Sequence, residues 1–157
     1  MGNAVATLVG QNLGAGHPDR AEKTVWIATL YNTIIVTSVI VLFYIFRFQV
    51  LGVFNQGEGG AAVIAAGAWI LTFTSIAAIL MPAGFVPLRG LNGAGDTITA
   101  MLISSGILWV IQIPMCALLG GMMGQNGVWL GVDIGAALTA VLAMLIFRAG
   151  KWKRVRV

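Results

Sequence analysis

The chain has 157 residues, of which 59% are hydrophobic and 9% charged, and its formal net charge is +4. Soluble domains carry about 25% charged residues, so this composition excludes an ordinary soluble fold and predicts an all-α membrane protein. Five of the nine Lys and Arg residues lie in the last ten positions. The positive charge therefore predicts a local basic tail, 148–157, and no partner nucleic acid.

The chain begins with a short apolar segment, 1–13, which covers only about 20 Å as a helix. We expect it to be a partial helix, the end of a span whose beginning is missing, as in a fragment of a longer transporter or a truncated gene. A short helix on the membrane surface is the alternative.

Four longer apolar runs follow, and each reaches the roughly 20 residues that cross about 30 Å of hydrocarbon as a helix. The runs are continuous and do not alternate with polar residues, which favours helices over barrel strands. The four predicted transmembrane helices cover about 24–46, 61–86, 98–119 and 128–147.

Two Gly-Ala-Gly motifs, at 14–16 and 93–95, each lie between predicted helices. Glycine ends helices because it adopts a left-handed conformation without steric cost. Pro18 suits the first turn of the next helix, and Asp96 is placed to cap the N-terminus of its own. A phosphate-binding loop is disfavoured, because no strand precedes either motif and neither continues as Gly-Lys-Ser/Thr.

Loop charges predict the orientation. If residues 1–13 lead to the cytoplasm, eight Lys and Arg residues lie inside and only Arg47 lies outside, and the C-terminal tail is cytoplasmic. We predict a multi-pass protein of the cell (inner) membrane, with Trp129 and Trp152 as anchors at the membrane surface. The longest outside loop, 48–60, should lie along the interface in its first half and be flexible in its second.

The motifs resemble those of one transporter family. "ATLVGQNLGAGHPDRAEK" resembles the end of the eighth helix and the following turn of MATE (multidrug and toxic compound extrusion) transporters, and "LRGLNGAGDT" the turn between their tenth and eleventh helices. "QIPMCALLG" and "GQNGVWLGVDIGAAL" resemble their last two helices. The resemblance implies helices nine to twelve of a twelve-helix protein with two six-helix lobes.

The family's activity is also implied: export of organic, often cationic compounds by antiport with H⁺ or Na⁺, with alternating access between the lobes. The helices that carry the family's main coupling carboxylates, the first and seventh, have no counterpart here, and 61–86 contains no acid. The partners we expect are the lipid bilayer, the missing N-terminal part of the transporter and small organic cations. Apart from the coupling ion we expect no cofactor and no metal site.

Asp133 is the only acid inside a predicted span, about 9 Å from its outer end when counted from Gly127. A charge at the bilayer centre costs about 2.5–3.5 kcal/mol. The carboxyl should therefore face a wet cavity or a partner, or be protonated. It is either a cation-facing or proton-handling group of the ion pathway, or a polar group at the rim that pairs with Arg47 or water.

The same helix carries Gly127, Gly131 and Gly135 at four-residue spacing, a pattern typical of close helix packing. Asp133 lies about 200° around the helix from Gly131, so it should point away from this glycine row.

Other polar or helix-breaking residues occupy membrane depth. Pro114 should bend the third span and free a carbonyl near Val110, and Pro82 should act as a hinge in the second span together with Pro87. Gln112 either lines the pathway or joins two helices. Three further pathway candidates could instead serve packing, the hydroxyls by bonding to their own helix. They are Asn32, Thr72 and Ser75.

Two alternatives remain open. A self-sufficient four-span protein could act as a dimer, as in the small multidrug resistance class, with Asp133 as the acid of each protomer. The strong charge bias and the unexplained segment 1–13 count against it. The second alternative is a non-transporting membrane subunit that packs through the glycine row. We find no nucleophile–base arrangement, so we do not expect an enzyme.

Overall fold

The computed structural model describes residues 2–54 and 60–154, and within these ranges the chain is helical with no strand. Helices α1 to α4 come first: Gly2–Gly14, Pro18–Ile45, Arg47–Phe54 and Gly60–Gly93. Helices α5, α6 and α7 follow at Thr97–Gly106, Ile113–Met123 and Gln125–Arg148. A π-helical segment, η1, joins α5 to α6 at Ile107–Gln112, and a short 3₁₀ helix, η2, covers Lys151–Arg154.

Four helical stretches are long and apolar enough to span a membrane: Pro18–Ile45, Gly67–Gly93, Thr97–Met123 and Gln125–Arg148. The predicted all-α, multi-pass membrane fold is confirmed. The helices extend past the predicted runs, most of all α4, which continues to Gly93. The segment at the N-terminus forms the 13-residue helix α1.

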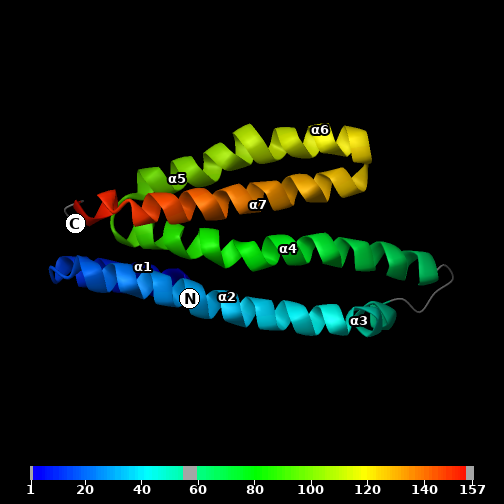
Figure 1. Cartoon of the computed structure of the whole chain (residues 1–157), viewed down its shortest axis with the longest axis horizontal. Helices are drawn as coiled ribbons and strands as arrows, with labels where there is room; N and C mark the ends of the chain where they lie inside the picture. The colour runs from blue at the N-terminus through cyan, green and yellow to red at the C-terminus, as the bar shows by residue number, and fades with distance from the viewer. Residues whose placement is uncertain (1, 55–59, 155–157) are drawn as a thin grey trace.

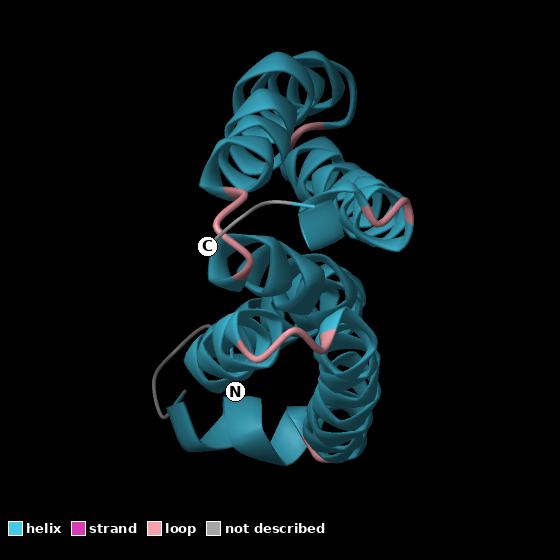
Figure 2. Ribbon diagram, turned by 90° about the vertical axis from the view of Figure 1, so that its left-hand side faces the viewer, coloured by secondary structure: helices cyan, strands magenta, loops and turns pink. Residues whose placement is uncertain are grey.

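The long helices lie side by side in the order α2, α4, α7 and α5–α6 (Figure 1). Both Gly-Ala-Gly turns lie at the end of the bundle where the chain also finishes, and we call this the turn end. Helix α3 and the α6–α7 connection lie at the opposite, far end. Seen along the helices, the molecule is a narrow stack and not a closed ring (Figure 2).

The turn-end connections follow their glycines. Gly16 and Gly95 adopt φ angles of 77° and 82°, the left-handed conformation that favours glycine. Pro18 begins α2, and the side chain of Asp96 accepts a hydrogen bond from the backbone N–H of Thr99 at 3.3 Å. Gly93 has a second role, since a Cβ there would overlap the backbone of Ala6 in α1. Glycine at this position therefore lets α1 and α4 touch.

The most completely buried side chains gather near the turn end and include Val9, Val25, Leu91 and Phe147. The chain after α7 folds back onto this core. The ring of Trp152, only 1% exposed, stacks on that of Phe147 with centroids 4.7 Å apart and donates from Nε1 to the Phe147 carbonyl at 2.7 Å. Its predicted role as a membrane-surface anchor is wrong, because the aromatic ring is packed inside the protein.

Trp129 also differs from the anchor that the sequence suggests. Its side chain is half-buried, and its Nε1 is buried without a hydrogen-bond partner among the described residues. A surface anchor would present this donor to the headgroup region.

Proline affects the two central spans differently. Pro82 and Pro87 both lie buried inside the continuous helix α4, whereas Pro114 is the second residue of α6, which follows the π-helical segment. In that segment the Ile113 N–H donates to the Leu108 carbonyl, five residues back. The predicted irregularity near Pro114 therefore takes the form of a wider helical turn.

The loop at 48–60, predicted to lie outside, is described in its first half, which forms the short helix α3. The second half, predicted to be flexible, includes residues 55–59 and lies outside the described residues.

Candidate functional site

Asp133 is a buried carboxyl in the centre of the bundle. It lies on α7, which runs between α4 and α5–α6 (Figure 1), and it is 7% exposed. The backbone amide of Ala77 in α4 interacts with its carboxyl, and Oδ1 has no hydrogen-bond partner among the described residues. An oxygen buried in this way can still accept a proton or contact a cation, since carboxylate oxygens have several acceptor positions.

The rim interpretation of Asp133 fits the structure less well. Helix α7 begins at Gln125, so Asp133 lies eight residues in, about 12 Å from the far end and about 22 Å from the turn end. Arg47 is engaged elsewhere: its Nη1 donates to the Tyr44 carbonyl at 3.0 Å, and its guanidinium lies over the rings of Tyr44 and Phe48. No salt bridge joins the two residues in the described part of the chain.

The glycine row lies on the other side of α7, against α6 and η1. A Cβ on Gly127 would overlap the Leu119 carbonyl, and one on Gly131 would lie 2.8 Å from the backbone nitrogen of Cys116. Backbone therefore packs on backbone along this face, and Asp133 faces the opposite neighbour, α4.

Gln112 ends the π-helical segment, and its side chain covers the last glycine of the row. A Cβ on Gly135 would lie 2.7 Å from Gln112 Oε1. Gln112 thus contacts the α6-facing side of α7, whereas Asp133 contacts the α4-facing side. The structure does not bring these two candidates into one cluster.

The hydroxyl candidates on α4 bond to their own helix. Thr72 donates to the Ala68 carbonyl at 2.9 Å, and Ser75 donates to that of Leu71. Thr72 also lines a hollow of about 420 Å³ with Tyr44 and Trp69. Asn32 lies half-buried on α2. These three residues and the pair on α7 and η1 therefore come from four different helical segments.

The candidate residues can be compared by their depth in the bundle, measured from the turn end. Counted at 1.5 Å per residue from the turn end of their own helices, Asn32, Gln112 and Asp133 all lie at about 21–22 Å. Helix α2 is about 42 Å long on the same measure, so this is its midpoint. Ser75 lies at about 27 Å, and Thr72 at about 31 Å. Asn32, Gln112 and Asp133 therefore form a band near the middle of the bundle, whereas Thr72 lies nearer the far end, beside Tyr44.

Residues that the sequence did not single out connect the end of the chain to α2. Lys153 Nζ lies 2.6 Å from Glu22 Oε2 and 3.2 Å from Asp19 Oδ1, and the ring of Trp26 meets Phe147 edge-on at 5.6 Å. The hydrogen bond that Lys153 donates to the Glu22 carboxylate raises the pKa of Lys153 above its usual value. The signal available in the sequence was the pair of acids near the start of one helix and the basic tail after the last helix.

Comparison with known proteins places this arrangement in a family. The probable multidrug resistance protein NorM of Pasteurella multocida is 27% identical over 154 residues, which cover 94% of this chain and 32% of the relative. The probable multidrug resistance protein YpnP of Bacillus subtilis is 23% identical, with 99% and 34% covered. Protein DETOXIFICATION 29 of Arabidopsis thaliana is 29% identical, with 93% and 29% covered.

The chain thus spans about a third of the length of the curated relatives it matches. No solved structure matches it. The MatE family model matches residues 1–118, a stretch that runs through both Gly-Ala-Gly turns and into α6. With three quarters of its sequence matched in this way, the chain belongs to the MatE family.

Proposed function

We propose that the chain forms part of the C-terminal lobe of a multidrug exporter, which moves organic, often cationic compounds out of the cell by antiport with H⁺ or Na⁺. Family membership supports the proposal, and so do the names of relatives that are called multidrug resistance proteins. Because the chain covers about a third of those relatives, the proposal places the complete pathway in an assembly larger than these four spans. The missing N-terminal part would supply the main coupling carboxylates.

The buried carboxyl of Asp133 is the observation that carries the proposal. Secondary transporters hold substrates and coupling ions near the middle of the membrane. An ionisable residue at that depth is expensive unless it has a partner, so it is a functional candidate. Asp133 lies at mid-depth, 93% buried, with an oxygen that has no partner among the described residues. In this proposal it takes up the proton or coupling cation in one state and releases it in the other.

The proposal places the turn end at the cytoplasmic face of the cell (inner) membrane. The charges of the described residues support this orientation. The turn end carries Arg20, Lys23, Arg89, Arg148, Lys151, Lys153 and Arg154, whereas the far end carries Arg47.

Alternating access needs helices that can bend. The buried prolines of α4 and the wider turn before Pro114 are the positions where two central spans depart from regular α-helical hydrogen bonding. We propose Pro82 and Pro114 as the hinges, with Gln112, Asn32, Thr72 and Ser75 along the path. Helix α6, which follows Pro114, would move together with α7 through the packing at Gly127 and Gly131.

The test is transport in cells. A strain that lacks the native gene is compared with the same strain carrying the gene restored at its own locus, and ethidium is the fluorescent organic cation. The restored gene should lower ethidium accumulation, and Asp133→Asn should remove this effect while the protein level stays normal. Asp96→Asn is the matched control, because Asn also caps helices and this residue lies outside the polar band.

The ion dependence separates the two antiport types. Efflux that stops when a protonophore is added indicates H⁺, and efflux that stops when external Na⁺ is removed indicates Na⁺. Equal accumulation with and without the gene would contradict the exporter proposal. Full efflux by Asp133→Asn would remove Asp133 from the pathway and leave the exporter proposal standing.

A further inference from the structure

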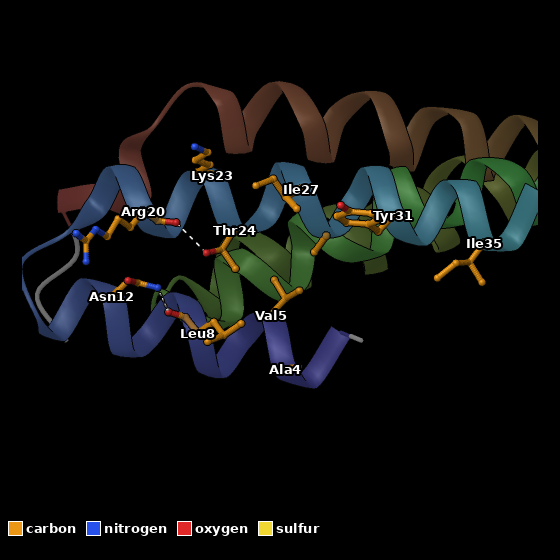
Figure 3. A pocket seen from close by; sticks show the side chains of 11 residues that line it. Ala4, Val5, Leu8, Asn12, Arg20, Lys23, Thr24, Ile27, Tyr31 and Ile35 are labelled. Carbon is orange, nitrogen blue, oxygen red and sulfur yellow. Dashed lines mark hydrogen bonds between the residues drawn. The ribbon is translucent and has the colours of Figure 1, made fainter.

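The groove between α1 and α2 is an open hollow of about 630 Å³ on the side of the bundle. Its lining changes character from one end to the other. Arg20, Lys23 and Asn12 lie at its turn end, and apolar side chains follow toward the middle of α2, up to Ile35 (Figure 3). A surface of this kind matches a molecule with an anionic head and an apolar tail.

Arg20 and Lys23 line the groove, and the acids of the same helix are not part of its lining. Asp19 and Glu22 are engaged by Lys153 of η2, whereas Arg20 and Lys23 line the hollow. Among the described residues neither of these cations has an acid within salt-bridge distance. The lining of the groove holds two cations and, among the described residues, no acid, so its charged end is positive.

The dimensions fit one leaflet of a bilayer. From Lys23, the lining of α2 continues through Ile27 and Tyr31 to Ile35, twelve residues or about 18 Å along the helix. Half of the hydrocarbon core is about 15 Å thick. A head bound at Arg20 and Lys23 would therefore leave its acyl chain lying along the apolar side chains. The volume also falls within the roughly 300–1,000 Å³ of ligand pockets.

The other described hollows lack this combination. The hollow beside Leu102 and Leu142 has no Lys or Arg in its lining, and in the one beside Trp69 the cation is Arg47, which already contacts two aromatic rings and a carbonyl. The hollow beside Asn92 holds a single cation, Arg89.

We propose that this groove binds one anionic phospholipid, with its phosphate between Arg20 and Lys23 and an acyl chain against Leu8, Ile27 and Tyr31. The site differs from the transport band, because it opens on the side of the bundle and does not include Asp133 or Gln112. It stands independently of the transport proposal, since it depends on charge and shape at one helix pair.

The experiment measures lipid binding to the full chain in detergent by native mass spectrometry. Phosphatidylglycerol is compared with phosphatidylcholine of the same acyl chains, so that the headgroup charge alone differs. We expect phosphatidylglycerol to bind at least ten-fold more tightly. Arg20→Gln/Lys23→Gln should reduce that preference by about five-fold for each cation. Arg148→Gln/Lys151→Gln removes the same charge from exposed turn-end positions outside the groove and should leave the preference unchanged.

A diazirine on the acyl chain of the lipid tests the location, and it should crosslink to α1 and α2. Inorganic phosphate at millimolar concentration should not displace the lipid, because it lacks the tail. Four results would overturn the proposal: equal affinity for the two lipids, equal loss in both double variants, crosslinks elsewhere, or displacement by phosphate. Crosslinking of two chains through the groove would also overturn it, since a second copy would then be the occupant.

Discussion

Adding a single methyl group at Gly131 or at Gly121 tests how closely the helices pack. The backbone nitrogen of Cys116 would lie 2.8 Å from a Cβ on Gly131, and a backbone atom cannot turn aside as a side chain can. Gly131→Ala should therefore lower the free energy of unfolding by about 1–3 kcal/mol. The measurement is thermal unfolding in detergent.

Gly121→Ala is the control for this variant. Gly121 lies on α6, and no described atom comes within 4 Å of a Cβ added there, apart from its own helix backbone and chain neighbours. Alanine is a better helix former than glycine, so this variant should be neutral or more stable by up to about 1 kcal/mol. Equal destabilisation by the two substitutions would show that the glycine row does not determine the packing.

At the residue scale, the sequence predicted how residues are spaced around a helix better than it predicted which residues each side chain contacts. The four-residue period of the glycines and the angle between Gly131 and Asp133 follow from helix geometry, and the structure has them on two different sides of α7. Which helix each side meets depends on packing between distant segments. Trp152 shows the same limit, because the turn after α7 carries it back onto Phe147.

The contribution of the 3₁₀ helix η2 to the stability of the bundle can be measured. Trp152 supplies a buried ring, so Trp152→Ala should destabilise the protein by about 3–5 kcal/mol in thermal unfolding. Trp152→Phe keeps the stacked ring and loses the Nε1 hydrogen bond to Phe147, so it should cost only about 0.5–1.5 kcal/mol. If the alanine variant loses no more than the phenylalanine variant, the ring does not hold η2 in place.

The ion pair of η2 has a defined pH dependence. The hydrogen bond that Lys153 donates to the Glu22 carboxylate raises the pKa of Lys153, so the charged lysine is favoured in the folded state. Its contribution is full below the unfolded value of about 10.4 and is lost as the pH rises through the folded pKa. Both side chains are partly exposed, which limits the contribution to about 1 kcal/mol.

Lys153→Gln tests that dependence. The difference in unfolding free energy between the wild type and this variant should stay constant between about pH 7 and 9 and disappear as the pH rises through the raised folded pKa of Lys153. A difference that changes steadily across the neutral range would mean that another titrating group controls the docking of the tail.

The N-terminal cap of α5 gives a further test at the element scale. Asp96→Ala removes the acceptor for the Thr99 N–H and should destabilise the protein by about 0.5–2 kcal/mol in thermal unfolding. Asp96→Asn should remain within a few tenths of a kcal/mol of the wild type, since asparagine caps equally well. A loss of equal size in both variants would mean that the carboxylate charge matters more than the cap.

At the element scale, the existence and length of the helices were predictable because a continuous apolar run of membrane length has no other stable conformation in lipid. The ends of the helices were less predictable. In α4, Pro82 and Pro87 would weaken an isolated helix, yet both are buried within one continuous helix. The π-helical segment before Pro114 likewise depends on contacts such as that of Gln112 with Gly135.

At the scale of the whole molecule, alternating helix directions follow from short connections, but neighbour relations do not. The sequence alone gave no reason for α7 to lie between α4 and α6, or for α1 to touch α4 at Gly93. Three candidates, Asn32, Gln112 and Asp133, therefore lie at one depth on different helical segments, and a single cluster did not form in the described chain.

The orientation of the whole molecule is tested by cysteine accessibility. In a Cys116→Ala background, which removes the one native cysteine, Lys151→Cys marks the turn end and Asn126→Cys the far end, and both positions are exposed. A membrane-impermeant maleimide should label Asn126→Cys in intact cells and Lys151→Cys only after permeabilisation, because the cations at the turn end keep it inside. The reverse pattern would contradict the proposed orientation. Labelling of both positions in intact cells would indicate chains inserted in two directions, as a self-sufficient four-span dimer requires.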